Sequence, residues 1–533
     1  MNILDLSDEI LLYIFKKLQN FDVLHSLLGS NRKLDAIVCD RILTQSIDFT
    51  RLVSNEKTKK IFDEFCAQIL PRIHRNIQCL KIDPCWLEFI LDTRQLNNLH
   101  RLHFTDVNIV TASKIFHETS SLIVNFKDQI EELSFTIDEE NISTFDLLIG
   151  IYRQIFCLLT NLKYLNLNMN SGFVLLKSLL DNLPSATCSS STVTHLNIKL
   201  HNIDDCFLLL DGRLSELHTL IVKLDFIHNQ ELLRRIPLET LCHSIILADK
   251  TKNFDKLKSF SLIAQQFTNE FDTLIVRFLR RMIHLETLFL SLRLYQRDTF
   301  IDYTYLENIF LRDLSCLQNF HFDIVVDHVI IHDNAKPCFS DIQQTFIRKG
   351  YHVDGYLDCA NHPAGLWNQC HIYSLPFMFE YMQPITNCFP GGLFKSVTVL
   401  WLKDTNHPFE HSFFMKISQS FPFVRCLTII NKLEQKHKDL SSMIQFSHLI
   451  ELQCGYVHID YIEQFLSSLY THLPALTKLA VQYEHLVAIT ENFTSDVIRI
   501  NCAKLKSIHF TDMQSTVHSK DFYHYFPSLN LSV

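Results

Sequence analysis

Two kinds of apolar spacing alternate along this chain. One is a short segment of the form L-x-x-L-x-φ, where φ is any apolar residue, and it predicts a strand with one buried face. The other has apolar residues three and four positions apart, as in residues 145–156, and it predicts an amphipathic helix. Residues 171–183 and 459–473 show the same helical spacing. The pattern therefore predicts an α/β protein of short strands and intervening helices.

The strand motif recurs fourteen times in order along the chain. Successive middle residues are mostly 22 to 32 positions apart, with one step of 40 and one of 80. Repetition at such a period indicates a repeat array. The middle residues of the motifs are Leu80, Leu102, Leu133, Leu165, Leu196, Leu220, Phe260, Leu288, Phe320, Leu400, Leu427, Leu452, Leu479 and Ile508.

One strand and one helix cannot cover their own apolar face, so each unit must bury it against the next. The motif and its period resemble leucine-rich repeats, and the resemblance implies a solenoid with parallel strands on a concave face and helices on a convex face. The asparagine column of that family is not consistent here, although Asn108, Asn168, Asn170 and Asn202 stand near the expected points. We therefore expect an irregular horseshoe with repeat blocks at 76–322 and 397–533, separated by an irregular insertion at 323–396.

The pattern of apolar and capping residues in 1–45 predicts a small helical module. Ser7 can N-cap a first helix whose first turn holds Asp8 and Glu9, where negative charge is favourable. A turn at Asn20–Asp22 predicts a short second helix, and a third is expected to begin near Ser30 or Asn31, with Leu34, Ile37 and Val38 on its buried side. Residues 46–75 are expected to be a helical linker or cap.

This module resembles the F-box, which attaches substrate receptors of cullin-RING ubiquitin ligases to a Skp1-type adaptor. Residues in register with the family pattern are Leu6, Glu9, Ile10, Ile14, Phe15, Leu18 and Asp22, followed by Leu24, Leu27 and Leu28 on the second helix. Ser7 replaces the family's proline, and Leu34 replaces an aromatic residue of the third helix. The resemblance implies that a Skp1-like adaptor, and through it a cullin, is bound by Leu6, Ser7, Ile10, Ile14, Leu18, Leu24 and Leu28. The alternative is a cap that seals the first repeat, which requires the apolar face to pack inward.

Composition argues against catalysis and against nucleic acid as a ligand. The chain has only ten glycines in 533 residues, and it has no Gly-rich phosphate loop, G-x-S-x-G elbow or H-E-x-x-H motif. A net charge of -9 gives no concentrated cationic face for phosphates. We expect no enzyme activity, no catalytic residues and no cofactor.

The sixteen cysteines are scattered without C-x-x-C pairs, which is typical of reduced thiols in a cytoplasmic or nuclear protein. The acidic N-terminus is unlike a signal peptide, and no window approaches the roughly 18 apolar residues that a membrane helix needs. We therefore expect no membrane partner.

The segment 323–396 offers a zinc alternative in Cys359, His362, Cys370 and His371. The spacing C-x2-H-x7-C-H has no standard second ligand pair, so the main interpretation is an irregular hairpin with strands near 351–357 and 371–375. We expect no bound metal. An unrecognised enzyme site that gathers Asp358, Cys359 and His362 is a further alternative.

Side chains next to the strand leucines should line the concave face, and their mixed polar and aromatic character suits a protein partner. Phe289, Trp401, His321 and Lys403 are the residues we expect to bind a substrate. The resulting hypothesis is a substrate receptor of an SCF-type ubiquitin ligase. The alternative is a repeat scaffold that binds proteins outside ubiquitination.

Overall fold

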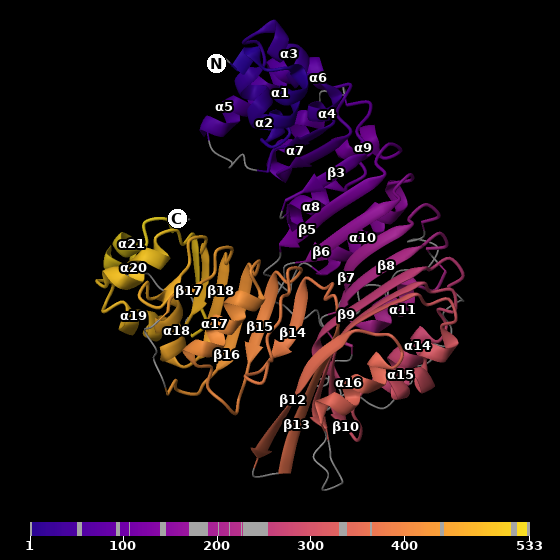
Figure 1. The fold of residues 1–533 in the computed structure, drawn as a ribbon. Coiled ribbons are helices and arrows are strands. Elements are labelled where there is room, and N and C mark those ends of the chain that lie inside the picture. The colour runs from indigo at the N-terminus through magenta and orange to yellow at the C-terminus, as the bar shows by residue number, and fades with distance from the viewer. Residues whose placement is uncertain are drawn as a thin grey trace. The chain divides into compact units, whose positions relative to one another are not determined.

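The computed structural model describes residues 3–50, 56–91, 96–105, 107–138, 145–169, 190–200, 202–212, 214–224, 226–227, 254–329, 338–362, 365–436, 442–512 and 520–529. The chain divides into two compact units. Unit 1 comprises Met1–Leu262, Asp272–Thr287 and Asp313–Gln318, and unit 2 comprises Ile263–Phe271, Leu288–Arg312 and Asn319–Val533. Helices and mostly parallel strands make up both units, so the predicted α/β class is confirmed (Figure 1).

Unit 1 begins with a helical module in which apolar residues close a small core. Its elements are η1 (Ile3–Asp5), α1 (Asp8–Phe15), α2 (Asn20–Leu27), α3 (Arg32–Val38) and α4 (Arg41–Thr44). Asn31 caps α3 by accepting from the Lys33 amide at 2.8 Å, and Leu34, Ile37 and Val38 are buried as predicted. The second helix already includes the residues predicted as a turn, because Gln19 is its N-cap.

The segment predicted as a helical linker also contains the first strand. Its elements are β1 (Ser46–Asp48), α5 (Glu56–Glu64), the π-helical turn η2 (Phe65–Ile69) and α6 (Leu70–Ile73). Ile47 of β1 pairs in parallel with Leu80 of the next strand, and both are fully buried. The sheet therefore begins about thirty residues before the first predicted motif, which corrects the boundary at 76.

The remaining strands of unit 1 are parallel, and the predicted leucines lie side by side. The strands are β2 (Cys79–Ile82), β3 (Arg101–Phe104), β4 (Val107–Asn108), β5 (Glu132–Asp138), β6 (Tyr164–Met169), β7 (His195–Leu200) and β8 (Thr219–Leu224). Leu80, Leu102, Leu133, Leu165, Leu196 and Leu220 are register partners in turn. Each is at most 1% exposed, so the motif residues form one continuous apolar row.

Helices connect these strands. They are α7 (Pro84–Leu91), α8 (Ile109–Ile115), α9 (Ser121–Phe126), α10 (Phe145–Leu158) and α11 (Ile203–Leu209). α10 confirms the helix predicted at 145–156, whereas the one predicted at 171–183 lies outside the described residues. Asn108 and Asn202 cap α8 and α11 with their side chains. Of the four asparagines noted after strands, Asn108 and Asn202 are therefore helix N-caps.

Unit 2 contains a first group of long strands in the order β9-β10-β11-β13-β12. Their bounds are β9 (Ser259–Thr268), β10 (Thr287–Arg297), β11 (Asn319–Val329), β12 (Val353–His362) and β13 (Gly365–Ser374). The helical segments of unit 2 are α15 (Tyr303–Ile309), most of η6 (Leu311–Asp313) and α16 (Phe339–Ile347). The segments η5 (Phe271–Ile275) and α14 (Val276–Leu279), which follow β9, belong to unit 1 except for Phe271. β13 pairs antiparallel with both β11 and β12, so residues 323–396 include the predicted hairpin, in longer and regular strands.

The second strand group of unit 2 repeats the parallel pattern in the order β14-β15-β16-β18-β20-β21 (Figure 1). Its strands are β14 (Tyr381–Ile385), β15 (Val399–Lys403), β16 (Cys426–Asn431), β18 (Glu451–Val457), β20 (Lys478–Val481) and β21 (Ser507–Phe510), with a small pair β17 (Ile444–Gln445) and β19 (Thr471–His472). Its helices are α17 (His411–Ser420), α18 (Ile459–Leu466), α19 (Tyr483–Ile489), α20 (Asp496–Cys502) and α21 (Lys520–Tyr525). The predicted row Leu400, Leu427, Leu452, Leu479 and Ile508 is again in register. The helix predicted at 459–473 ends at Leu466, because β19 follows.

Candidate functional site

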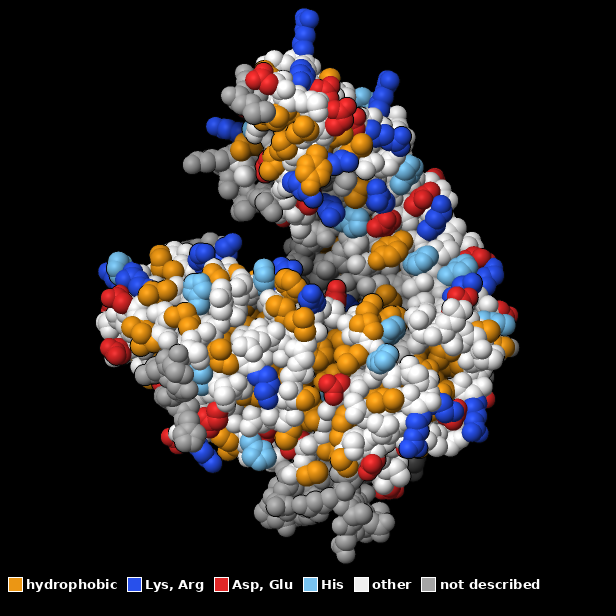
Figure 2. Space-filling view, in the orientation of Figure 1, with side chains coloured by type: hydrophobic (Ala, Val, Ile, Leu, Met, Phe, Trp, Pro, Cys, Tyr) orange, Lys and Arg blue, Asp and Glu red, His pale blue; other side chains and the backbone are white. Residues whose placement is uncertain are grey.

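The first helix of the N-terminal module leaves part of its apolar face in solvent. Ile10 is 48% exposed, Ile14 is 37% exposed, and Leu18, just past the helix end, is 55% exposed. These residues are four positions apart, a spacing that places Ile10 and Ile14 on one side of α1. Figure 2 shows hydrophobic side chains gathered on this module, over α1 and α2.

The opposite side of α1 holds the module together. Leu11 and Phe15 are buried there, together with Leu24 of α2 and Leu34 of α3. Leu24 is fully buried, so it belongs to the core and not to the surface predicted to bind the adaptor; Leu28 is half-buried. The sequence pattern did not separate these roles, because large aliphatic residues occur on both the buried and the exposed side of α1.

Hydrogen bonds from Lys33 hold the segment before α1 in place. Lys33 Nζ donates to the carbonyl oxygens of Leu4 and Leu6 at 3.0 and 2.8 Å, and Leu6 itself is half-buried. Ser7 occupies the N-cap position of α1 but its side chain makes no capping bond to the backbone. The pKa of Glu9 is lowered mainly by a hydrogen bond from its own backbone amide and next by one from the Ser7 hydroxyl. The predicted capping role of Ser7 is therefore wrong, although the helix starts where predicted.

The four residues expected to bind a substrate lie on strands of unit 2. Phe289 of β10 stacks on His321 of β11 with ring centroids 4.8 Å apart, and burial lowers the pKa of His321. Trp401 and Lys403 lie two positions apart on β15 and are half-buried. Trp401 meets the Tyr381 ring edge to face at 6.4 Å. The structure thus joins Phe289 to His321 and places Trp401 and Lys403 on one face of β15.

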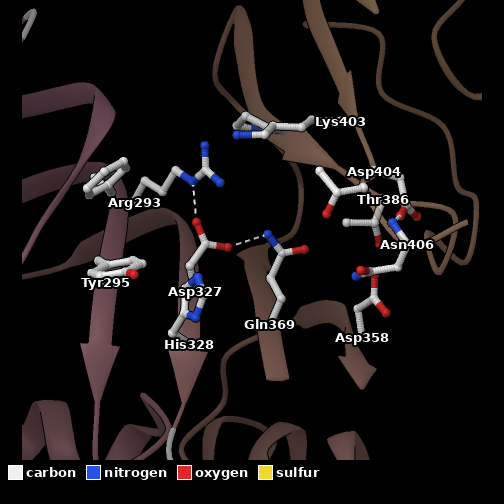
Figure 3. A pocket seen from close by; sticks show the side chains of 13 residues that line it. Arg293, Tyr295, Asp327, His328, Asp358, Gln369, Thr386, Lys403, Asp404 and Asn406 are labelled. Carbon is white, nitrogen blue, oxygen red and sulfur yellow. Dashed lines mark hydrogen bonds and ion pairs between the residues drawn. The ribbon is translucent and has the colours of Figure 1, made fainter. Parts of the chain in front are cut away.

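A cavity of about 240 Å³ lies within unit 2, at the carboxyl ends of β14 and β15 and beside the ends of β9 and β11. Crevices at the carboxyl ends of strands are common ligand sites. Residues lining the cavity are Phe267, Arg293, Tyr295, Asp327, His328, Asp358, Gln369, Pro384, Thr386, Lys403, Asp404, Thr405 and Asn406. Figure 3 shows these side chains and labels ten of them.

A carboxylate organises one side of the cavity. Asp327 accepts from Arg293 Nε at 2.5 Å and from Gln369 Nε2 at 2.6 Å (Figure 3). The Arg293 and Asp327 side chains are only 13% and 12% exposed. Because such a pair is shielded from solvent, its partners are held in fixed positions.

Lys403 faces the same group. Burial lowers the pKa of its ammonium, the Arg293 charge lowers it further, and Asp327 acts in the opposite direction. The Lys403 amine and the Arg293 guanidinium point toward each other in Figure 3.

A local irregularity brings two consecutive residues of β11 to the cavity. The register between β11 and β13 shifts between Val326 and Val329, and His328 has a φ of 58°. In a regular strand, neighbouring side chains face opposite sides, whereas a bulge redirects one of them. Asp327 and His328 consequently line the same cavity. No glycine marks this bulge, so it could not be predicted from the sequence.

A buried polar network that includes the cavity residue Thr386 joins the two strand groups of unit 2. Asp323 Oδ1 lies 2.7 Å from His371 Nε2, and Asp323 Oδ2 accepts from the Gln383 amide at 2.7 Å. His371 Nδ1 lies 3.3 Å from the Tyr356 hydroxyl, which accepts from the Thr386 amide at 3.0 Å. The network therefore connects β11, β12 and β13 to β14.

This network changes the interpretation of the zinc alternative. Both ring nitrogens of His371 have partners, Cys370 is buried, and burial raises the pKa of its thiol to about 12. Cys359 is exposed, and the His362 side chain is outside the described residues. Within the described ranges, no group of three or more His, Cys, Asp or Glu residues is arranged to hold a metal ion. Asp358 lines the cavity, and Cys359 is not among the described residues that line it.

No protein-family model and no curated protein matches this chain. Among the described helices, none is both long and apolar enough to cross a membrane. Function must therefore be argued from the two features above, the open face of α1 and the cavity of unit 2.

Proposed function

We propose that this protein is a non-catalytic adaptor, the substrate receptor of an SCF-type ubiquitin ligase. Residues 1–45 bind a Skp1-like adaptor and through it a cullin. The strands of leucine-rich repeats at 76–322 and 397–533 hold a protein substrate, with Phe289, His321, Trp401 and Lys403 among the contacts. The protein contributes proximity between the substrate and the ubiquitin carrier, in the cytoplasm or nucleus.

The observation that supports docking is the exposed row Ile10, Ile14 and Leu18. A cap that only seals the first repeat would turn this row inward, because exposed isoleucine and leucine gain nothing from solvent. Burying a side chain of this size in a partner's groove contributes about 1.5–3 kcal/mol. The row therefore suits a helix that lays one apolar face against another protein.

The repeat interpretation is supported by the aligned motif residues. Five register partners beginning at Leu400 and six beginning at Leu80 form two apolar rows. Such stacking leaves the intervening strand side chains at the surface, where they form an extended binding face.

The test is binding of purified Skp1 to the full chain, measured by calorimetry. We expect a complex with the unaltered protein, and at least a hundredfold weaker binding when Ile10→Asp and Ile14→Asp are combined. The matched control combines Val110→Asp and Val124→Asp, which place the same charges on exposed apolar positions of α8 and α9.

Circular dichroism serves to verify that both double variants are folded. If the unaltered, well-folded protein forms no Skp1 complex, the proposal is contradicted. The alternative of a repeat scaffold that acts outside ubiquitination would then be favoured. Equal loss in both double variants would show that the effect is not specific to α1.

A further inference from the structure

The cavity of unit 2 holds two cations that share one carboxylate. Arg293 pairs with Asp327 through Nε, and both oxygens of Asp327 are engaged, one by Arg293 and one by Gln369. Among the described residues, Lys403 Nζ and the two Nη atoms of Arg293 have no hydrogen-bond acceptor in the structure. Several charged donors therefore converge on one partly desolvated space (Figure 3).

This arrangement is unfavourable unless a ligand or water completes it. Two cations that face each other in a half-buried site repel, and each donor removed from water costs free energy until it is paired. A neutral acceptor is also present, because Gln369 Oε1 is buried without a hydrogen-bond partner among the described atoms. Hydrogen-bond donors of Arg293 and Lys403 and the acceptor Gln369 Oε1 thus line the same cavity.

The charges around the cavity decide which anion fits. Arg293 and Lys403 supply two positive charges, while Asp327, Asp358 and Asp404 line the same space. A single negative charge between Arg293 and Lys403 is attracted by both cations. A second negative charge on the same group would face three carboxylates, so a dianionic phosphate is disfavoured. A carboxylate also matches the planar guanidinium.

The neighbouring wall is aromatic. Phe267 and Tyr295 rings lie 5.0 Å apart, and Tyr295 meets the His328 ring at 4.5 Å. Phe267 is 36% exposed, which leaves ring surface available to an apolar group next to the charged end.

We propose that this cavity binds a carboxylate, held between Arg293 and Lys403, with the apolar part of its bearer against Phe267 and Tyr295. The carboxylate belongs either to a free small molecule or to the C-terminus of a polypeptide. The site is built entirely from unit 2 residues, so the proposal does not depend on the N-terminal module or on Skp1.

The experiment uses trace acetylation of the lysines of the full chain, read by mass spectrometry, with benzoate as the probe. Benzoate is expected to protect Lys403 but not Lys395, an exposed lysine of the same unit. Benzamide, which has the same ring and no charge, should give no protection. Phenyl phosphate should protect less than benzoate, and stronger protection by it would overturn the choice of a carboxylate.

Substitution of Lys403 tests the site by calorimetry. Lys403→Gln removes no side-chain hydrogen bond described in the structure, so the fold is expected to remain, as circular dichroism will verify. Benzoate binding should weaken about tenfold or more, the usual loss of a charge-assisted hydrogen bond. Lys403→Arg should retain binding, and Lys395→Gln should leave it unchanged. Unaltered binding in Lys403→Gln would overturn the proposal.

The source of the carboxylate is distinguished by a second pair of probes, acetyl-Gly-Phe with a free carboxylate and its C-terminal amide. Tighter binding of the free acid than of benzoate assigns the site to a polypeptide end. Binding of benzoate with none of the free acid assigns it to a small molecule. Failure of both acids to bind or to protect Lys403 refutes the site.

Discussion

Removing the Asp323 carboxylate tests whether the buried network holds unit 2 together. Asp323 and His371 have no exposed side-chain surface, and Asp323 also accepts the Gln383 amide at 2.7 Å. In Asp323→Ala, the His371 ring and the Gln383 N–H lose their partner in a site that water does not reach.

The expected loss of unfolding free energy follows from the polar groups that Asp323→Ala leaves without a partner. Each buried polar group without a partner costs about 1–3 kcal/mol, and Asp323→Ala leaves two such groups, the His371 ring and the Gln383 N–H. We therefore expect the free energy of unfolding of unit 2 to fall by about 2–6 kcal/mol. Asp323→Asn keeps the shape and an acceptor for the Gln383 amide, so a smaller loss of about 1–3 kcal/mol is expected.

Hydrogen exchange is the direct assay, because the Gln383 amide is itself a donor in the network. Exchange in peptides that cover β14 should accelerate about a hundredfold or more in Asp323→Ala. Asp298→Ala, which changes an exposed aspartate of the same unit, is the control. If β14 exchanges at the same rate in both variants, the network does not fasten β14 and the reasoning fails.

Three further substitutions test separate parts of the chain. Ser7 has a φ of -67°, which suits proline, so Ser7→Pro should raise the stability of the N-terminal module by about 0.4–1 kcal/mol in thermal unfolding and preserve Skp1 binding. Gly150 lies within α10 with nothing within 4 Å of an added Cβ, so Gly150→Ala should add about 0.5–1 kcal/mol in urea unfolding, and destabilisation would contradict the open space at that position. Burial lowers the pKa of His321 below its ordinary 6.5, so the folded state binds fewer protons than the unfolded chain just below that pH. Its contribution to stability is lost as pH falls through 6.5, and His321→Phe should flatten that part of the profile of unfolding free energy against pH; an unchanged slope would refute this assignment.

The N-terminal module shows which structural features the local sequence pattern can predict. The cap of α3 at Asn31 and the buried residues Leu34, Ile37 and Val38 could be predicted, because capping and helical periodicity act within one or two turns. The division of leucines between core and surface could not. Leu24 is buried while Leu18 is exposed, and this depends on how α1, α2 and α3 pack.

The strands that carry the repeated motif, and the leucines that meet between them, could be predicted from local pattern, whereas β1 could not. Leu400, Leu427, Leu452 and Leu479 align in the sheet because each sits at the same place in a local motif and each must be buried. Tertiary structure alone decided the cavity. Arg293, Asp327, Gln369 and Lys403 come from four different strands, and of these the sequence pattern indicated only Lys403 as a binding residue. The antiparallel insertion of β13 beside β11 and the bulge before Val329 bring their charges together, and neither leaves a local signal in the chain.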